Sequence, residues 1–547
     1  MNNPMLFDCW ACYGPGPAKD PSQRWTLEQL LEDLDLYGIS AALVRHEQGL
    51  NYDPMHINRR LVAETAEHRD RLFPCWNAMP HQPGDFPEPD AFCAAMDQAD
   101  VRAVLITPNT HGYPIHSDVL APLAAALNSR RTLVLTTLAE LGADYRNATT
   151  FCRTFADCSV IIAEATWGQW RLAVSILDAC PNACLELSAF QANRAPEFLM
   201  ARYGPERVLL GTGLPRRSGA AARGFVDWAL GDPADVAKFA GLNLARCLNV
   251  PPPKPLALPE ESDQMVVEAR NGKPLSALVL DAHCHVLDDG LDGAGGRYVM
   301  LKGDSLNIVA LAERMGVDVT AMMSWSGTVS MDVVAGNALL EQVVDRSPQQ
   351  IIGLSSADPT HQTESDIRNV CERLHGQLGF RGLKPYTRNN VPYNDPRYAP
   401  YWEYANAHRL YGLLHTAANV GGMKAVHDLA ERYPDVTFLV AHSGGSWALA
   451  RQVVDVASQF PNVMAELTYT GAVNRVVEWF CEQIGPDRVL FGTDAPMRDP
   501  RPQLAWCVHT ALPESQKQLI VGGNFARILR QGVLPPHKLP DVITGQL

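Results

Sequence analysis

The chain contains two long segments that match each other, and this duplication limits the possible folds more than any other feature. Residues 484–496 near the C-terminus correspond almost position for position to residues 203–215 in the first half. Asp494, however, corresponds to Gly213. A repeat that keeps its framework while one copy loses an acidic residue indicates a duplicated domain in which one copy has kept its chemistry. We therefore expect the active site in the second half.

Two further matches indicate that the repeat covers whole domains. Residues 181–188 match 461–468, and residues 241–248 match 522–529, at a nearly constant spacing. A repeat this long means two domains rather than a solenoid, and a chain of 547 residues suits two domains of roughly 250 residues each. The expected divisions are a degenerate first domain at 1–250, a Pro-rich and polar linker at 251–275, and a catalytic domain at 276–547.

Eight short β-rich runs alternate with amphipathic, helix-length stretches in the second half. The runs are Ala277–Asp281, Val319–Met323, Ile351–Ser355, Phe380–Lys384, Tyr411–His415, Thr437–His442, Asn462–Leu467 and Arg488–Asp494. Eight βα units in about 250 residues predict a (β/α)8 barrel, with an open doubly wound sheet as the alternative. With the repeat, the predicted fold class is α/β, as two tandem (β/α)8 TIM barrels.

Polar residues suited to metal chemistry stand at the ends of these predicted strands. His283 and His285 are two residues apart, so on a strand both side chains point to the same face. Four further strands end in Lys384, His415, His442 and Asp494. Imidazole and carboxylate groups suit zinc or a similar divalent ion. Because a barrel places its active site at the carboxyl ends of its strands, this pattern predicts a metal site there.

The first half lacks all of these residues. The positions of His283, His285, Lys384, His415, His442 and Asp494 correspond to Trp10, Cys12, Leu105, Thr136, Glu164 and Gly213. Joint loss of six residues from a retained framework indicates that they form one site. We expect an intramolecular pseudo-dimer in which the first barrel supports the second, and a further homo-oligomer is left open. Redox chemistry at Cys9 and Cys12, or a metal held by Cys12 and Glu164, are the alternatives for the first half.

The second half resembles the amidohydrolase superfamily, in the branch of aminocarboxymuconate-semialdehyde decarboxylase, resorcylate-type decarboxylases and related metal-dependent hydrolases. The resemblance lies in residues 281–285, His415, His442 and residues 492–494. It covers nearly all of residues 276–530 and extends weakly to the first half. It implies one divalent ion, expected to be zinc, on His283, His285, His415 and Asp494. It also implies that His442 is a catalytic acid or base beside that ion.

Lys384 leaves two arrangements open. In binuclear members of this superfamily a carbamylated lysine ending strand 4 bridges two metal ions, and Lys384 stands at that place. With a single ion, Lys384 would instead bind an anionic group of the substrate. Arg388 and Trp325 are further candidates for substrate binding, so we expect a small substrate that is anionic, planar or carboxylated.

Three functions follow from these residues. The first is hydrolysis of a C–N, C–O or C–C bond by a metal-activated water, with Asp494 accepting the proton and His442 or the metal stabilising the oxyanion. The second is metal-dependent, non-oxidative decarboxylation of a small aromatic or muconate-type acid, with His442 or Asp494 protonating the carbon. The third is a non-catalytic, metal-binding scaffold. The first two use the same residues, so the sequence does not separate them.

Composition excludes several other classes of function. The formal net charge of −14 argues against nucleic acid and against anionic membranes as partners. No apolar run reaches the ~18 residues of a transmembrane helix, and the N-terminus lacks the parts of a signal peptide. The 13 cysteines form no disulfide framework. We therefore expect a cytoplasmic enzyme with reduced cysteines.

Overall fold

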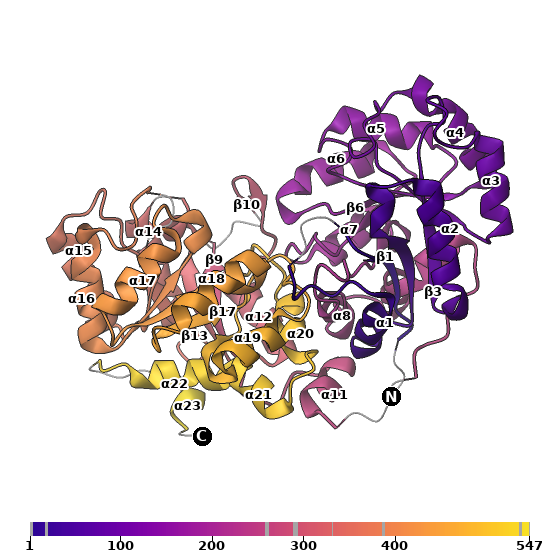
Figure 1. The fold of residues 1–547 in the computed structure, drawn as a ribbon. Helices are drawn as coiled ribbons and strands as arrows, with labels where there is room; N and C mark the ends of the chain where they lie inside the picture. Colours follow the sequence, from indigo (N-terminus) through magenta and orange to yellow (C-terminus); the bar gives the residue numbers. More distant parts are fainter. Residues whose placement is uncertain are drawn as a thin grey trace. The chain divides into compact units, whose positions relative to one another are not determined.

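The chain forms two barrels of the predicted type. The computed structural model describes residues 4–16, 20–257, 262–287, 294–330, 332–385, 389–534 and 539–545. Contacts divide the chain into two compact units, Met1–Glu260 and Glu261–Leu547. Each unit contains eight parallel strands in one sheet, with helices around the strands (Figure 1). The prediction of two tandem (β/α)8 barrels is therefore confirmed.

The strands of the first barrel follow one another in chain order. They are β1 (Phe7–Tyr13), β2 (Ala41–His46), β3 (Leu72–Ala78), β4 (Ala103–Ile106), β5 (Leu133–Thr137), β6 (Val160–Ala163), β7 (Ala183–Glu186) and β8 (Val208–Leu209). The helices are α1 (Leu27–Leu36), α2 (Pro54–Glu64), α3 (Pro89–Gln98), α4 (Ser117–Arg130), α5 (Tyr145–Thr154), α6 (Trp170–Ala179), α7 (Ala195–Tyr203), α8 (Ala220–Asp227), α9 (Pro233–Ala237) and α10 (Asn243–Leu248). The amide of Cys9 donates to the carbonyl of Leu210 at 3.0 Å, which closes the barrel between β1 and β8.

The second barrel repeats this order. Its strands are β9 (Leu280–Val286), β12 (Val319–Ser324), β13 (Ile351–Ser355), β14 (Gly382–Leu383), β15 (Tyr411–Leu414), β16 (Thr437–Val440), β17 (Val463–Glu466) and β18 (Val489–Leu490), with a hairpin of β10 (Ala294–Gly295) and β11 (Tyr298–Val299). Its helices are α11 (Gln264–Arg270), α12 (Ser305–Met315), α13 (Trp325–Thr328), α14 (Val333–Arg346), α15 (Glu364–Cys371), α16 (Ala399–His408), α17 (Gly422–Arg432), α18 (Trp447–Ala457), α19 (Val476–Ile484), α20 (Pro500–Val508), α21 (Glu514–Gln518), α22 (Asn524–Gln531) and α23 (Asp541–Thr544). The amide of Thr493 donates to the carbonyl of His283 at 3.1 Å and closes this barrel.

The first strand of the second barrel lies further along the chain than predicted. It spans Leu280–Val286 rather than Ala277–Asp281, so His283 and His285 lie inside the strand instead of after it. Cys284 and Val286 are buried in an apolar cluster with Met322 of β12. This packing continues the strand beyond Asp281, because alternate residues still have an apolar surface to contact.

Part of the expected linker is helical. Helix α11 lies within residues 251–275, where composition alone suggested extended chain. The side chain of Asp263 accepts a hydrogen bond from the amide of Val266 and caps the helix. Met265, Val266 and Ala269 are buried, so a short apolar face attaches this helix to the second unit. A few apolar residues among polar ones were enough to order the segment.

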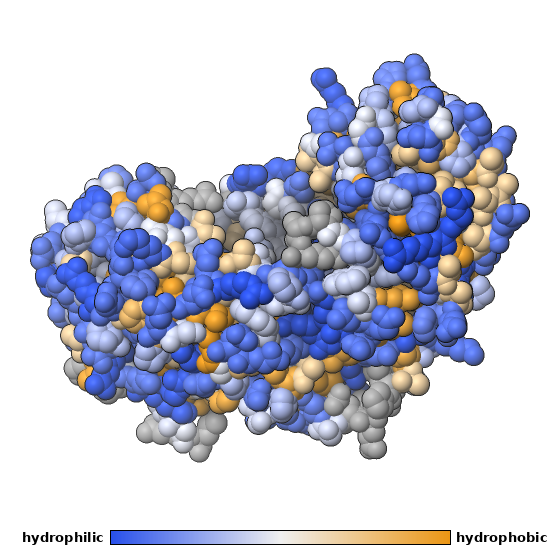
Figure 2. All heavy atoms as spheres, in the orientation of Figure 1, coloured by the Kyte–Doolittle hydropathy of each residue, from blue (hydrophilic) through white to orange (hydrophobic). Residues whose placement is uncertain are grey.

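The interior of each barrel is filled by side chains. Leu280, Leu354, Leu413 and Leu439 are buried in one cluster of the second barrel, and Phe7, Leu43, Leu105 and Leu135 in that of the first. Because side chains fill the interior, chemistry is expected at the barrel mouth, which is the end of the barrel where the carboxyl ends of the strands lie. The face shown in Figure 2 is largely hydrophilic with scattered apolar residues. None of the helices in the described ranges is long and apolar enough to cross a membrane.

Candidate metal centre

A hydrogen-bonded frame at the mouth of the second barrel holds two chain segments together. The buried carboxylate of Asp281 accepts hydrogen bonds from the amide of His283 at 3.0 Å, from the amide of Thr493 at 3.0 Å and from the hydroxyl of Thr493 at 2.6 Å. Burial raises the pKa of Asp281 to about 7. This frame fixes β9 against the segment after β18, and so places His283 beside Asp494.

Three of the predicted residues form a compact donor cluster. Ligand atoms of His283, His442 and Asp494 all lie within 4.8 Å of one another, and all three residues are buried. His285 Nε2 is 3.3 Å from Asp494 Oδ1, and the rings of His415 and His442 are 4.5 Å apart. The structure therefore gathers all five predicted metal and catalytic residues at one mouth. The tightest group contains His442, which the sequence assigned to catalysis rather than to the metal.

The backbone at two of these residues is unusual. His442 and Asp494 have φ values of 64° and 53°, in the left-handed region that residues other than glycine seldom adopt. The corresponding residues of the first barrel, Glu164 and Gly213, have φ values of 58° and 72°. The two barrels thus share a backbone that turns these positions sharply after the strand. Such conformations are concentrated at functional sites, which fits a metal centre here.

Hydrogen bonds fix the orientation of two histidine rings. His442 Nδ1 lies 2.7 Å from the carbonyl oxygen of Thr468, so it carries the proton and Nε2 is left with its lone pair. His283 Nδ1 lies 3.1 Å from Glu466 Oε2, and Nε2 of the same ring faces Asp494 at 3.5 Å. A carboxylate or carbonyl behind the ring is the usual support of a metal-binding histidine. Glu466 and Thr468 therefore orient the donor cluster.

The donor atoms fit a divalent cation. Within the part of the chain that the structure describes, His283 Nε2, His415 Nδ1 and Asp494 Oδ1 are buried without a hydrogen-bond partner, while Asp494 Oδ2 faces Arg498. Buried polar atoms without partners are costly, and a cation bound among them would remove that cost. Burial, followed by the charge of Lys384, lowers the pKa of His283 and His285 well below the usual range. Neutral imidazoles with one carboxylate are suitable ligands for zinc and similar ions.

Two basic side chains border this cluster. Lys384 is 1% exposed, and burial lowers its pKa to about 7. Arg498 is buried, forms an ion pair with Asp494 and donates from Nε to Thr470 Oγ1 at 2.7 Å. Burial lowers the pKa of Arg498 only to about 10, so the guanidinium stays charged at neutral pH. A buried site with these groups favours an anionic ligand.

Trp325, the aromatic residue predicted to bind substrate, also borders the site. The ring of Trp325 lies 5.2 Å from that of His285, and Tyr298 of the β10–β11 hairpin lies 6.1 Å from Trp325. These rings form an aromatic wall beside the donor cluster. Arg388, the other predicted substrate-binding residue, lies outside the described residues.

Sequence reasoning missed Arg498, Glu466 and Thr468. A signal was present, because Arg498 has a counterpart in Arg217 and Glu466 has one in Glu186. Residues shared by both copies were interpreted as framework. The structure shows that this framework also surrounds the site.

The first barrel keeps the frame and replaces the donors. Asp8 accepts hydrogen bonds from the amides of Trp10 at 2.8 Å and Thr212 at 2.9 Å, as Asp281 does in the second barrel. At the metal positions, Trp10 Nε1 donates to Glu164 at 2.6 Å, and Arg217 forms an ion pair with the same carboxylate. An indole and an ion pair thus occupy the place of the metal ligands.

The cysteines of β1 do not form a redox pair. Cys9 and Cys12 are free and buried, and burial raises the pKa of Cys12 to about 12. A thiol with so high a pKa is a poor nucleophile at neutral pH.

Comparison with protein families identifies both halves. The amidohydrolase family model matches residues 15–250 and 280–531. The chain belongs to the amidohydrolase family. The two matched regions follow the two barrels, so this amidohydrolase is a tandem duplication. No curated protein matches the chain.

Several solved structures resemble one half of this amidohydrolase. 5-Carboxyvanillate decarboxylase from Sphingomonas paucimobilis is 18% identical, with 47% of this chain and 99% of that chain covered and a TM-score of 0.37. 2,6-Dihydroxybenzoate decarboxylase from Rhizobium is 14% identical, with 46% and 98% covered and a TM-score of 0.37.

Proposed function

We propose that the second barrel binds one divalent metal ion and catalyses the non-oxidative decarboxylation of a small, planar carboxylic acid. The observation that carries this proposal is the buried guanidinium of Arg498 against Asp494, beside the amine of Lys384. A guanidinium that stays charged, beside an amine that is protonated in part at neutral pH, suits a substrate that carries its own negative charge. The proposal prefers the second function expected from the sequence to the first, which was hydrolysis.

The ion pair between Arg498 and Asp494 also makes the site less suited to hydrolysis. In the hydrolytic reaction Asp494 would take a proton from the attacking water. In this structure the guanidinium of Arg498 lies against the carboxylate that would have to accept this proton. Decarboxylation requires no deprotonation of water, only an oriented anionic substrate and a proton for the carbon that loses carbon dioxide.

Each residue of this site has its own role in the proposed reaction. His283, His285, His415 and Asp494 hold the ion, which would supply a Lewis acid for a substrate oxygen. Arg498 and Lys384 bind the carboxylate, and Trp325 packs against a planar substrate. His442 is the proton carrier: Nδ1 donates to the carbonyl of Thr468, so the lone pair of Nε2 can accept a proton in the site and return it to the substrate carbon.

Isotope labelling tests the reaction. The full-length protein, loaded with zinc or with manganese, is incubated with carboxyl-¹³C-labelled hydroxybenzoic acids, and ¹³CO₂ is measured by membrane-inlet mass spectrometry. We expect ¹³CO₂ from wild type and none from Asp494→Asn. Failure to release ¹³CO₂ from these acids, together with release of an acid that contains ¹⁸O from labelled water out of the corresponding amides or esters, would establish hydrolysis instead.

Hydrolysis with two metal ions is the second candidate, and Lys384 supports it. The amine is buried and, among the described residues, has no hydrogen-bond partner. With a pKa of about 7, much of it is neutral at physiological pH, and the neutral amine is the form that reacts with carbon dioxide to give a carbamate. Two equivalents of metal in wild type and one in Lys384→Met would favour this candidate.

A further inference from the structure

The loop that follows β17 borders two side chains that the proposed reaction uses. The carbonyl of Thr468 accepts a hydrogen bond from His442 Nδ1 at 2.7 Å, and the hydroxyl of Thr470 accepts one from Arg498 Nε at 2.7 Å. Tyr469 stands between these two threonines. The centre of its ring lies 5.8 Å from the ring centre of His442 and 5.3 Å from the guanidinium carbon of Arg498. Tyr469 therefore lies beside both the proton carrier and the group that binds the carboxylate.

Tyr469 is held in place from two sides. The side-chain amide of Gln503, on α20, accepts a hydrogen bond from the backbone amide of Tyr469 at 3.1 Å and donates one to its carbonyl at 2.9 Å. Gln503 is 0% exposed, and it spends both polar ends of its side chain on this one residue. The ring lies against Gly445, where a Cβ would come within 3.0 Å of two ring carbons. Tyr469 itself is 37% exposed, so its ring is fixed at the edge of the site and is not buried in the fold.

The first barrel lacks this arrangement. Ala189 and Ala222 stand at the positions of Tyr469 and Gln503, in segments that otherwise match. The ring and the side chain that fixes it are thus both absent from the barrel that has no metal ligands. Because that barrel keeps its fold without them, the fold alone does not explain Tyr469 and Gln503.

Trp325 stands on the other side of the same site. It follows β12, whereas Tyr469 follows β17, and around the closed barrel β18 and β9 lie between these two strands. The ring of Trp325 lies 5.2 Å from that of His285, and the strand register places Glu47 at its position in the first barrel. Aromatic side chains on both sides of a charged guanidinium suit a ligand that is flat as well as anionic.

We propose that Tyr469 packs against the planar ring of the substrate while Arg498 binds its carboxylate, so that Tyr469 selects aromatic over aliphatic acids. Gln503 is then a positioning residue, which acts by fixing Tyr469. This assignment rests on the decarboxylation proposed above, since that reaction places a carboxylate at Arg498. Contacts between aromatic rings add to the free energy of binding beyond the area that they bury.

Titration calorimetry with benzoate and propionate tests the selection, because both are carboxylates and only benzoate has a flat ring. The full-length, zinc-loaded protein is compared with Tyr469→Ala, which introduces the residue of the first barrel. We expect the variant to bind benzoate about tenfold more weakly and propionate within about twofold of wild type. Tyr469→Phe keeps the ring and should bind both acids as wild type does. Equal benzoate affinity in wild type and Tyr469→Ala, an equal loss for propionate, or no binding of benzoate by wild type would overturn the proposal.

A double-mutant cycle tests the role of Gln503. Gln503→Met keeps the size of the side chain but removes both hydrogen bonds, and we expect it to weaken benzoate binding about threefold. In Tyr469→Ala the same substitution should have no further effect, because the ring that it positions is gone. Losses that add up in the double variant would contradict a positioning role. Tyr469→Leu, which has no flat ring, takes the place of Tyr469→Ala if circular dichroism shows that the alanine variant does not fold.

Tyr404 provides a matched aromatic control in the same barrel. It stacks on His408 of α16, with ring centres 4.1 Å apart, and Tyr404→Ala should bind benzoate as wild type does. Release of ¹³CO₂ from hydroxybenzoic acids is measured on the same proteins. Release by wild type with equal benzoate affinity in Tyr469→Ala would overturn the role of Tyr469 alone. Weaker benzoate binding by Tyr469→Ala without ¹³CO₂ from wild type would overturn the reaction and leave the selection of flat acids standing.

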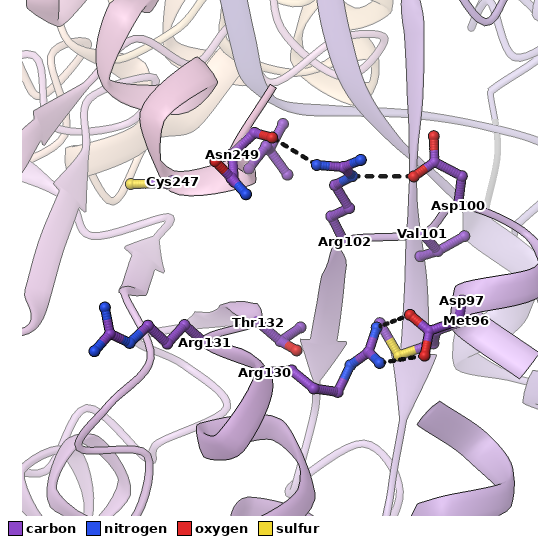
Figure 3. A pocket seen from close by; sticks show the side chains of 11 residues that line it. Met96, Asp97, Asp100, Val101, Arg102, Arg130, Arg131, Thr132, Cys247 and Asn249 are labelled. Atoms are coloured by element: carbon purple, nitrogen blue, oxygen red, sulfur yellow. Dashed lines mark hydrogen bonds and ion pairs between the residues drawn. The ribbon is translucent and has the colours of Figure 1, made fainter. Parts of the chain in front are cut away.

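A basic cavity elsewhere in the chain provides a control for benzoate that binds away from the metal centre. It has a volume of about 340 Å³ and lies among the residues that precede β4 and β5 of the first barrel (Figure 3). There Arg130 is paired with Asp97, whereas Arg131 is exposed and points away from this pair. Arg131→Met should bind benzoate as wild type does. A loss of benzoate affinity in Arg131→Met as large as that in Tyr469→Ala would contradict a binding site at Tyr469.

Discussion

At the scale of single residues, the two barrels differ in a few side chains on a shared frame. Asp8 and Asp281 accept equivalent backbone hydrogen bonds, and Glu164 and His442 adopt the same left-handed backbone. The function of each mouth therefore depends on the side chains that this frame presents. In one barrel they are histidines around Asp494, and in the other an indole and arginines.

Removing single histidines should separate metal binding from catalysis. His283→Asn loses a ligand whose Nε2 faces Asp494, so we expect metal content to fall at least about tenfold. His442→Asn should keep the metal but lose activity, since we assign its Nε2 to proton transfer. Metal content is measured by plasma mass spectrometry. Equal metal loss in both variants would make His442 a ligand.

The buried carboxyl of Glu186 should give the first barrel a measurable pH dependence. Burial, and next the charge of Glu164, raises the pKa of Glu186 from 4.5 to about 7. The folded state then holds a proton that the unfolded state has released, so stability from this group is complete below pH 4.5 and is lost as pH rises through 7. Relative to Glu186→Gln, wild type should lose about 2–3 kcal/mol between about pH 5 and about pH 8.

Thermal unfolding across this pH range measures the effect as a difference between wild type and Glu186→Gln. Glu67→Gln, which changes an exposed carboxyl in the same unit, is the control and should follow wild type. A constant difference between wild type and Glu186→Gln at all pH values would contradict the raised pKa.

At the scale of elements, the contact that closes each barrel also builds the mouth. Asp281 on β9 accepts from Thr493 after β18, and Asp8 on β1 accepts from Thr212 after β8. The same hydrogen bonds therefore close each sheet and position the residues that follow β8 or β18. The repeated Gly-Thr of the sequence marks this contact in both halves.

A matched pair of substitutions separates the effect of this contact on stability from its effect on metal binding. Thr493→Val and Thr212→Val each leave a buried carboxylate with one hydrogen bond fewer, so each should destabilise the chain by about 1–3 kcal/mol. Thr493→Val alone should also weaken metal binding, because it loosens the segment that carries Asp494. Chemical denaturation and metal titration are the measurements. A similar loss of metal affinity in Thr212→Val would argue against this division.

At the scale of the whole molecule, the chain consists of two complete barrels, and α11 belongs to the second. Lys517 forms an ion pair with Asp263 at 2.7 Å, and Glu514 accepts from the amide of Gln264 at 3.0 Å. The second unit therefore begins before the end of the linker expected from composition.

Fragments of the second unit test this boundary and the role of the first barrel. A fragment of residues 262–547 keeps α11, whereas residues 276–547 lose its buried Met265 and Val266, a loss of about 3–5 kcal/mol. Thermal unfolding should show the longer fragment to be the more stable. We also expect the longer fragment to be less active than the full chain, as a supporting first barrel requires. Full activity in the fragment would show that the first barrel is dispensable.

The sequence by itself determined the duplication, the two barrels and the residues at the ends of their strands, because periodicity and strand-end position are local properties of the chain. Only the tertiary structure decided what surrounds those residues. Glu466 reaches His283 across 183 positions of the chain, and Arg45 meets Trp10 between two strands. The first contact depends on barrel closure, which brings distant segments to one mouth, and the second depends on the pairing of β1 with β2. For that reason the orientation of the donors, the buried cation beside Asp494 and the arginine against the indole of the first barrel could not be predicted from residue spacing.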